Sequence, residues 1–390
     1  MSRRSRSPRK FPLSGRSRQH TEPVVAVDAR RRHQRGEAVE QFQRREEQRA
    51  VPPGPGLVLV EQAGRPGAPP ARRRFSQPTS LIKYSDGSCS IVTLGAVPLV
   101  FVTPMRILVC LNRDLASNVA LNLLLPALAG HEVKVGLTER VGTSVVVDEP
   151  PGRAELRTAE QTLPNEVLFP LVELAALLDD GRRYLTFGEI ERHRGIPVQT
   201  LLNPNAPPGL ELVEAFAPDL IVTIRYGAIL KAPVIRVPRL GVLNLHSGAL
   251  PEYRGVLATF RALMHGDSEI ACTLHYISDG TIDTGDIIGI KRVAVNPSQS
   301  LLAHILALYP PGIALITRTI NALARGEPIP HAPQPDSGGA YYTYPTANEW
   351  AEFTRKGWRV ASPNDLLSVY RLYLQRSSTT DRKSDPTSAG

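Results

Sequence analysis

The sequence predicts an α/β fold with a Rossmann-like, mostly parallel sheet. Apolar runs of strand length recur from residue 105 onward, and segments with helical periodicity separate most of them. Strands that alternate with helices favour parallel pairing through right-handed crossovers. The predicted strands cover residues 107–111, 132–137, 197–200, 218–224, 241–245, 271–277 and 340–344.

The predicted helices fill the intervals between these strands. Residues 141–165 have no clear periodicity, and we expect an irregular segment there. The helix over 299–325 is expected to be long or broken, because Pro310 and Pro311 interrupt it. The other predicted helices cover residues 118–128, 167–178, 186–194, 210–216, 255–265, 348–355 and 363–373.

The turn after the first strand argues against a nucleotide cofactor. Residues 112–118 contain no glycine. A phosphate cradle and a dinucleotide fingerprint both need glycines there, because the backbone has to approach the phosphate closely. The sequence therefore carries no nucleotide-cofactor signal at this position.

The positive charge belongs to the N-terminal part of the chain. The 390 residues have a formal net charge of +9. Residues 1–104 carry 19 basic and 8 acidic side chains, whereas residues 105–390 carry 27 and 29. Because the remainder is almost neutral, nucleic acid is not an expected partner of the folded part.

The composition divides the chain into four parts: a disordered basic extension, a main domain, a small C-terminal α/β extension and a disordered tail, over residues 1–104, 105–330, 331–378 and 379–390. Three interpretations of the first part stay open. It can be an arm that touches RNA or an anionic surface, or a targeting peptide, which its prolines and Glu22 disfavour. In the third interpretation the protein starts at Met105.

The three cysteines favour a reduced, cytoplasmic protein. Cys89, Cys110 and Cys272 show neither a disulfide framework nor metal-ligand spacing. Cys110 and Cys272 lie in predicted strands and are interpreted as buried thiols. No apolar run reaches transmembrane length, so a membrane is not an expected partner.

Two stretches bring together side chains that can do chemistry. Residues 240–255, LGVLNLHSGALPEYRG, place Asn244 and His246 on one face of a strand that ends in a turn. In an open α/β sheet, ligands bind at such carboxyl ends of strands. Residues 273–288, TLHYISDGTIDTGDII, lead from another strand into a loop with Asp279, Asp283 and Asp286.

Together these groups suit a polar reaction. An amide can stabilise an oxyanion, an imidazole can move a proton, and a carboxylate can hold the imidazole in place.

These motifs resemble the folate-dependent formyltransferases, the family of glycinamide ribonucleotide, methionyl-tRNA and sugar-amine formyltransferases. The resemblance covers about residues 105–330 and implies the formyltransferase fold there, with this part as the catalytic domain. The upstream pieces at 217–222 and 227–230 match in order and spacing. The defining motifs are Asn244-Leu-His246, Leu250-Pro251, Tyr253-Arg-Gly255 and Ile282-Asp283-Thr-Gly-Asp286.

The resemblance also implies a catalytic set and a cosubstrate. The family's catalytic asparagine, histidine and aspartate fall on Asn244, His246 and Asp283. The cosubstrate is 10-formyltetrahydrofolate, and no metal is implied. The loops that would flank its pterin, largely through backbone groups, contribute Arg225, Tyr226, Gly227, Ile229, Leu230, Ser278, Asp279 and Gly280.

The chain departs from the family pattern in ways that bear on the acceptor. Ser247-Gly248-Ala249 stands where the family often has Pro-Ser-Leu, and the spacing from His275 to Asp283 looks one residue longer. The glycine-rich phosphate loop of the glycinamide ribonucleotide enzymes is missing, which argues against a phosphoribosyl acceptor. About 60 residues follow residue 330, too few for the C-terminal barrel of the tRNA enzymes. The resemblance therefore favours a small primary amine, with an amino sugar as one candidate.

Other functions stay open at this point. The same three residues can hydrolyse formyl-folate when water replaces the amine. A methionyl-tRNA acceptor and a non-catalytic RNA- or folate-binding role are the remaining alternatives. A homodimer, with the short C-terminal segment as its contact, is also left open.

The motif residues have purely structural interpretations as well. Asn244 can cap the turn, and His246 can be a loop histidine with satisfied hydrogen bonds. Asp286 can be the working carboxylate in place of Asp283. His275, in mid-strand, is interpreted as a buried supporting group and not as a catalyst.

Three further features of the sequence are an arginine, a histidine and a group of tyrosines. Arg254 either anchors a loop or reaches an anionic substrate group. His331 and the proline-rich residues around it are interpreted as a linker. The alternating tyrosines are interpreted as core and rim in preference to a ligand wall; these are Tyr341, Tyr342 and Tyr344.

Overall fold

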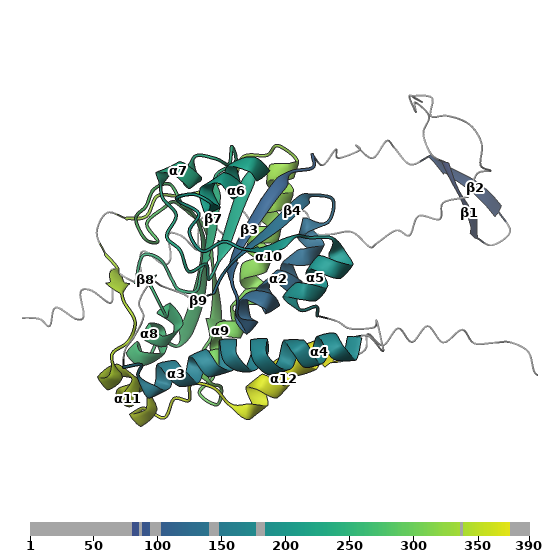
Figure 1. Cartoon of the computed structure of the whole chain (residues 1–390). Coiled ribbons are helices and arrows are strands. Elements are labelled where there is room, and N and C mark those ends of the chain that lie inside the picture. The colour runs from purple at the N-terminus through teal and green to yellow at the C-terminus, as the bar shows by residue number, and fades with distance from the viewer. Residues whose placement is uncertain are drawn as a thin grey trace, which may run out of the picture. The chain divides into compact units, whose positions relative to one another are not determined.

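A computed structural model describes residues 80–85, 88–93, 103–139, 148–176, 184–335 and 338–374. In this part of the chain seven strands form one sheet, in the order β10-β9-β7-β6-β3-β4-β5 (Figure 1). The strands from β5 to β7 are parallel, and β9 and β10 complete the sheet by antiparallel pairing. Their bounds are β3 Arg106–Asn112, β4 Glu132–Thr138, β5 Val198–Thr200, β6 Leu220–Ile224, β7 Val242–His246, β9 Glu269–Tyr276 and β10 Ile287–Ala294.

This topology is the mostly parallel α/β fold that the sequence predicts. The central strands are buried on both faces, which explains why they appear in the sequence as continuous apolar runs. Strand β10 was not predicted. It lies at the sheet edge, exposes alternate residues and shows a register shift between Ile287 and Gly289, so it lacks such a run.

Helices cover both faces of the sheet. Val213 and Phe216 of α6 (Gly209–Phe216) and Val234 of α7 (Ala232–Ile235) form one core with Val242 of β7. On the other face, Gly312 of α10 (Tyr309–Ala324) lies against Leu245 of the same strand. Since side chains alternate along a strand, Asn244 and His246 leave β7 on the α6–α7 side.

Three more helices belong to the main domain. α2 (Leu115–Leu128) packs on α10, and α5 (Phe187–Arg194) begins at a capping box formed by Thr186 and Glu189. α9 (Leu301–Ala307) precedes α10, and the break between them falls at Leu308. The break lies before the prolines and not at them, because Pro310 and Pro311 occupy the first turn of α10, where a missing N–H costs nothing.

Residues 151–176 form a helical segment that the sequence did not predict in full. It runs through α3 (Pro151–Arg157), two π-helical stretches at Thr158–Thr162 and Pro164–Leu168, and α4 (Phe169–Ala176). Pro151 and Pro164 each start one of these pieces, a position that proline tolerates. The expectation of an irregular segment over 141–165 is therefore wrong from Pro151 onward.

The C-terminal segment packs into the same hydrophobic interior as the main domain. β11 (Ala340–Tyr342) pairs in parallel with β8 (Tyr253–Gly255), a strand that was expected to be a loop. Trp350 and Phe353 of α11 (Ala347–Arg355) lie 4.6 and 4.7 Å, ring to ring, from Phe260 of α8 (Ala258–His265).

The last helix described, α12, lies beside α4. It spans Pro363–Leu374, and Figure 1 shows it alongside the helical segment that starts with α3. The rings of Phe169 and Tyr373 are 5.6 Å apart, which joins the two helices.

Within the predicted N-terminal extension, the structure describes one β-hairpin. β1 (Ser80–Ser85) pairs antiparallel with β2 (Ser88–Thr93), so the expectation of disorder over 1–104 does not apply to these two strands. The rest of the predicted extension up to residue 102, and the predicted disordered tail at 379–390, lie outside the described residues.

One helical stretch among the described residues, Leu301–Ala324, is long and apolar enough to cross a membrane by length and composition alone. No stretch of transmembrane length was expected from the sequence. Its most apolar part is 56% buried inside the protein, and α10 packs on α2, β9 and β10. Such burial is typical of the core helix of an α/β domain.

Candidate active site

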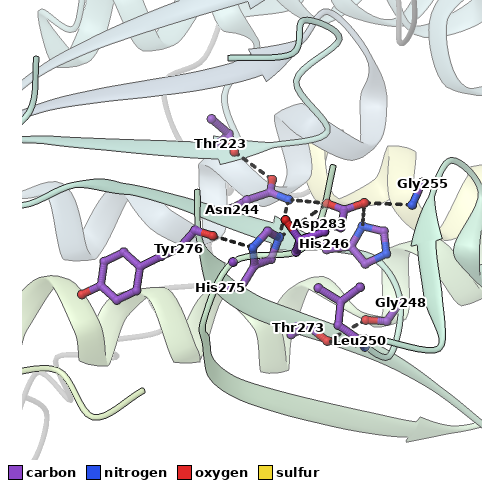
Figure 2. A network of polar contacts seen from close by, with 12 residues as sticks. Thr223, Asn244, His246, Gly248, Leu250, Gly255, Thr273, His275, Tyr276 and Asp283 are labelled. Atoms are coloured by element: carbon purple, nitrogen blue, oxygen red, sulfur yellow. Dashed lines mark hydrogen bonds and ion pairs between the residues drawn. The ribbon is translucent and has the colours of Figure 1, made fainter. Parts of the chain in front are cut away.

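Three polar side chains form a row across neighbouring strands at the centre of the site. Strand register places Thr223 of β6 beside Asn244 of β7, and Asn244 beside His275 of β9. The Thr223 hydroxyl lies 2.8 Å from Asn244 Oδ1, and Asn244 Nδ2 lies 3.0 Å from His275 Nε2 (Figure 2). The sheet itself therefore fixes the orientation of the Asn244 amide.

Asp283 completes the site from the loop after β9. Its backbone is left-handed, with φ of 55°. Oδ2 accepts a hydrogen bond from the Gly255 N–H at 2.9 Å and lies 3.4 Å from His246 Nδ1. Oδ1 lies 3.3 Å from Asn244 Nδ2 and 3.5 Å from His275 Nε2. One carboxylate thus lies next to Asn244 and His246 of β7 and His275 of β9 (Figure 2).

The environment keeps this carboxylate ionised. Burial by itself raises the pKa of Asp283, but its partners, the charge of His246 first among them, lower it to about 2. A buried anion of this kind needs cationic or N–H partners, and His246 and the Gly255 N–H provide them.

His246 faces an acceptor at each ring nitrogen. Nε2 lies 2.6 Å from the backbone carbonyl of Tyr253, so the Nε2–H group donates a hydrogen bond to that oxygen. Nδ1 faces the Asp283 carboxylate. The doubly protonated ring satisfies both contacts, and this form can donate a proton to a substrate.

Gly248 explains one departure from the family pattern. A Cβ atom there would lie 2.8 Å from His246 Nε2 and 2.5 Å from the Cβ of Ala258. A residue with a side chain therefore does not fit under His246 unless the ring or α8 moves.

His275 contributes more to the site than the buried supporting role that was predicted from the sequence. Its Nδ1 donates to the Tyr276 carbonyl at 2.8 Å, which leaves Nε2 as an acceptor for the Asn244 amide. Both amide hydrogens of Asn244 then point to protein acceptors, one to His275 and one to Asp283. The bond to Asp283, at 3.3 Å, is the longer of the two and the easier to exchange for a ligand.

A cavity of about 800 Å³ opens in front of these residues. Asn244, His246 and Asp283 all line it, as do most of the loop residues expected to flank the cosubstrate. Those that line it are Arg225, Tyr226, Gly227, Ile229, Leu230 and Asp279. Ser278 and Gly280 belong to the same loop but are not among the lining residues. The roles assigned to all these residues stay predictions.

Arg225 is held in a buried ion cluster and does not point freely into the cavity. Its Nε lies 3.2 Å from Asp114 Oδ2, and Nη2 lies 2.7 Å from Glu160 Oε2. Burial lowers the pKa of Arg225, but the two carboxylates raise it well above its ordinary value. Burial raises the pKa of Glu160 to about 7, although Arg225 opposes that shift.

Other residues that line the cavity come from parts of the chain that no sequence motif connects with the site. α3 and the π-helical stretch after it provide Arg153 and Glu160, and the C-terminal segment provides Tyr341 and Tyr344. The Arg153 guanidinium lies 3.8 Å from the ring centre of Tyr344. A ligand wall was the less favoured interpretation of these tyrosines, and no local signal in the sequence places them here.

Two of the three cysteines lie in strands of the central sheet, Cys110 in β3 and Cys272 in β9. Cys110 and Cys272 are buried and free, as predicted, and burial raises the pKa of each to about 12. In the described ranges, no group of three or more His, Cys, Asp or Glu side chains is placed to hold a metal ion.

Comparison with known proteins assigns the centre of the chain. Residues 203–304 match the formyl transferase family. This formyl transferase segment contains Asn244, His246 and Asp283, and the resemblance predicted from the sequence is confirmed there.

The relatives of the formyl transferase segment are named for one acceptor. A methionyl-tRNA formyltransferase from Parvibaculum lavamentivorans is 39% identical over 178 residues, which are 43% of this chain and 52% of that protein. The chain spans about half the length of the curated relatives it matches.

Two solved structures are similar at low sequence identity. Glycinamide ribonucleotide transformylase 1 from Symbiobacterium toebii is 18% identical, covering 60% of this chain and 95% of that chain, with a TM-score of 0.40. The N-formyltransferase from Helicobacter canadensis, in complex with folinic acid and dTDP-3-aminofucose, is 17% identical, covering 66% and 84%, with a TM-score of 0.41.

Proposed function

We propose that the protein transfers a formyl group from 10-formyltetrahydrofolate to a primary amine. The observation that carries this proposal is the convergence of Asn244, His246 and Asp283 at one cavity inside the formyl transferase segment. A reaction at a formyl carbon needs a donor for the developing oxyanion and a path for one proton. This set of side chains can supply both.

In the proposed mechanism a neutral amine attacks the formyl carbon, and negative charge develops on the formyl oxygen. Asn244 donates one N–H to that oxygen by giving up its long contact with Asp283, while His275 keeps the amide oriented. Protonated His246 donates to the same oxygen through Nδ1, by giving up its 3.4 Å contact with Asp283 Oδ2. One oxyanion donor contributes about 3–4 kcal/mol to the transition state in acyl transfer.

Asp283 has the electrostatic part in this mechanism. Its carboxylate stays ionised beside His246 and stabilises the protonated ring. We infer that it also orients a water that carries the proton from the attacking amine to the departing folate nitrogen. The carbon–nitrogen bond to the folate then breaks and leaves tetrahydrofolate and a formylated amine.

The acceptor of the formyl group has two candidates. Relatives that match the chain in sequence are named methionyl-tRNA formyltransferases, which supports an aminoacylated tRNA. The match covers only about half of those proteins, and after β11 the described residues contain two helices, α11 and α12. A small amine, such as an amino sugar, is the candidate that needs no further nucleic-acid-binding part.

The test is an absorbance assay of 10-formyltetrahydrofolate conversion with the full chain. The panel of acceptors contains methionyl-tRNA, nucleotide-linked amino sugars and simple primary amines. Acceptor-dependent release of tetrahydrofolate supports the proposal and identifies the acceptor class. Release at the same rate without any acceptor would replace it with formyl-folate hydrolysis, and binding of folate without release would replace it with a non-catalytic role.

Substitutions test the three residues directly. Asn244→Ala, His246→Ala and Asp283→Ala should each lower kcat by at least about 100-fold, because each removes a donor or the charge that supports one. Asp286→Ala is the matched control. The Asp286 side chain is half-exposed, and its ion-pair contact is a long one, 3.9 Å, to the exposed His331. Near-normal turnover in a folded Asp283→Ala protein, with a loss in Asp286→Ala, would move the carboxylate role to Asp286.

A further inference from the structure

The C-terminal segment reaches into the site through one glutamine. Gln334 Nε2 donates to the backbone carbonyl of Asp283 at 2.9 Å and to that of Gly285 at 2.8 Å. A glutamine amide has two N–H bonds, so both are used on this one loop. Its Oε1 is buried and makes no hydrogen bond with the residues that the structure describes.

The loop that Gln334 holds is a constrained one. Asp283 has a left-handed backbone, a conformation that a residue with a side chain keeps only when its surroundings hold it there. Gly285 is pressed against the chain, since a Cβ there would lie 1.9 Å from the carbonyl oxygen of Tyr276. The two carbonyls that Gln334 binds therefore belong to two constrained residues of the loop.

Gln334 is itself well anchored. Ala332 and Ile287 exchange both backbone hydrogen bonds, at 2.8 and 2.9 Å, directly after the loop. On its other side the segment continues into β11, which pairs with β8. Strand β8 contains Gly255, whose N–H binds the Asp283 carboxylate. The same C-terminal segment therefore supports both the backbone and the carboxylate of Asp283.

We propose that Gln334 is a positioning residue, which keeps the Asp283 carboxylate between His246 and Asn244 during turnover. The proposal rests on the proposed formyl transfer, because it assigns to Gln334 a part in that reaction. It makes the C-terminal segment a component of the catalytic site and not an appendage of the domain. The loss of about 1 Å in placement of a catalytic group can lower a rate about 100-fold.

Gln334→Met is the decisive variant, because methionine has a similar length but donates no hydrogen bond. We expect kcat to fall about 10- to 100-fold, with a much smaller change in KM for 10-formyltetrahydrofolate. In an Asp283→Asn background the same substitution should lower kcat no further, because the carboxylate it positions is already gone. Unchanged kcat in Gln334→Met, or full additivity with Asp283→Asn, would overturn the proposal.

Gln334→Glu adds a measurement, the pH dependence of activity, that would not change if Gln334 had only a structural role. An ionised glutamate faces two carbonyl oxygens and cannot donate, whereas a protonated one can donate to one of them. The activity of Gln334→Glu relative to the unmodified protein should therefore rise as the pH falls. The same ratio for Gln334→Met should stay constant across that pH range, and parallel behaviour of the two variants would contradict the positioning role.

A measurement without turnover separates this proposal from the proposed function. Amide hydrogen exchange of residues 278–286 should become faster in Gln334→Met and stay unchanged in the control Gln299→Ala, whose side chain makes no hydrogen bond with the described residues. If the unmodified protein shows no formyl transfer, the proposed function fails, and this exchange result alone decides whether Gln334 holds the loop. Unchanged exchange in Gln334→Met means that it does not.

Discussion

At the scale of single residues, Asp283 and Glu160 are two buried carboxylates with opposite pKa shifts. Asp283 has His246 and the Gly255 N–H against its carboxylate, so its charged form is favoured. Glu160 has one arginine, Arg225, which it shares with Asp114, and burial outweighs that partner. The two carboxylates should therefore affect folding stability in different pH ranges.

Asp283 should stabilise the protein at neutral pH and stop doing so in acid. Its pKa is about 2 in the folded protein against an ordinary 3.8, a difference worth about 2 kcal/mol. This contribution is complete above about pH 4 and is lost as the pH falls toward 2. Urea unfolding at a series of pH values should show this slope in the unmodified protein and a weaker one in Asp283→Asn. Equal slopes in both would mean that the carboxylate is not held as described.

Glu160 should act in the other direction. Its pKa is raised from 4.5 to about 7, so the folded protein binds a proton that the unfolded chain has already released. The stability from this group is complete below about pH 4.5 and is lost as the pH rises through 7, by on the order of 2–3 kcal/mol. Glu160→Gln should flatten this decline in unfolding free energy between pH 5 and pH 8. A decline as steep as that of the unmodified protein would assign it to other groups.

At the scale of elements, the turn after β7 is shaped around His246. Gly248→Ala puts a Cβ 2.8 Å from His246 Nε2, 2.5 Å from the Cβ of Ala258 and 3.0 Å from the Tyr253 carbonyl that His246 binds. We expect kcat to fall about 10- to 100-fold because the ring is displaced. Thermal unfolding and folate binding measured on the same sample are the controls. A normal kcat would show that the turn can adjust around the added methyl group.

The elements that could be predicted from the sequence are those with local causes. β3 and β6 consist mainly of apolar residues, because both faces of these strands are covered. The start of α3 could not be foreseen, since Gly152 looks like a helix breaker in the sequence. In the structure a Cβ at Gly152 would lie 2.5 Å from Trp350, so this glycine is needed by a distant partner.

The same distinction holds for the site. Asn244, His246 and Asp283 were named from sequence motifs, and the structure brings them together. His275 was underrated because its contact with Asn244 depends on the register between β7 and β9, which no short motif encodes. Gln334 follows Asp283 by 51 residues and has no sequence pattern of its own, so its two hydrogen bonds become visible only in the fold.

At the scale of the whole molecule, the main domain and the C-terminal segment should unfold together. Phe260 is fully buried under Trp350 and Phe353, and Tyr373 is fully buried beside Phe169. Both tryptophans of the protein, Trp350 and Trp358, lie in the C-terminal segment. Tryptophan fluorescence and far-UV circular dichroism should therefore give one coincident urea transition. An earlier fluorescence transition would mean that the segment detaches from an intact domain.

Truncations test the same unity in another way. A chain of residues 103–374 should keep its folded state and its turnover, whereas a chain that ends at Pro330 should fail to fold. Removal of a buried aromatic such as Phe353 alone typically costs about 3–5 kcal/mol. Solubility, circular dichroism and the folate assay on both chains provide the measurement, and an active chain ending at Pro330 would contradict this prediction.

Cytoplasmic location and a homodimer stay predictions.

The pairing of β11 with β8 has a consequence for protein engineering. Tyr341 lines the cavity from the strand that hydrogen-bonds to the segment containing Gly255, and Gly255 binds Asp283. A graft or mutant library aimed at Tyr341 to change acceptor preference will therefore also disturb the catalytic carboxylate. Residues 253–255 and 332–344 should be exchanged between homologues as one unit. A change of acceptor preference depends on how these two segments pack together and not on Tyr341 alone.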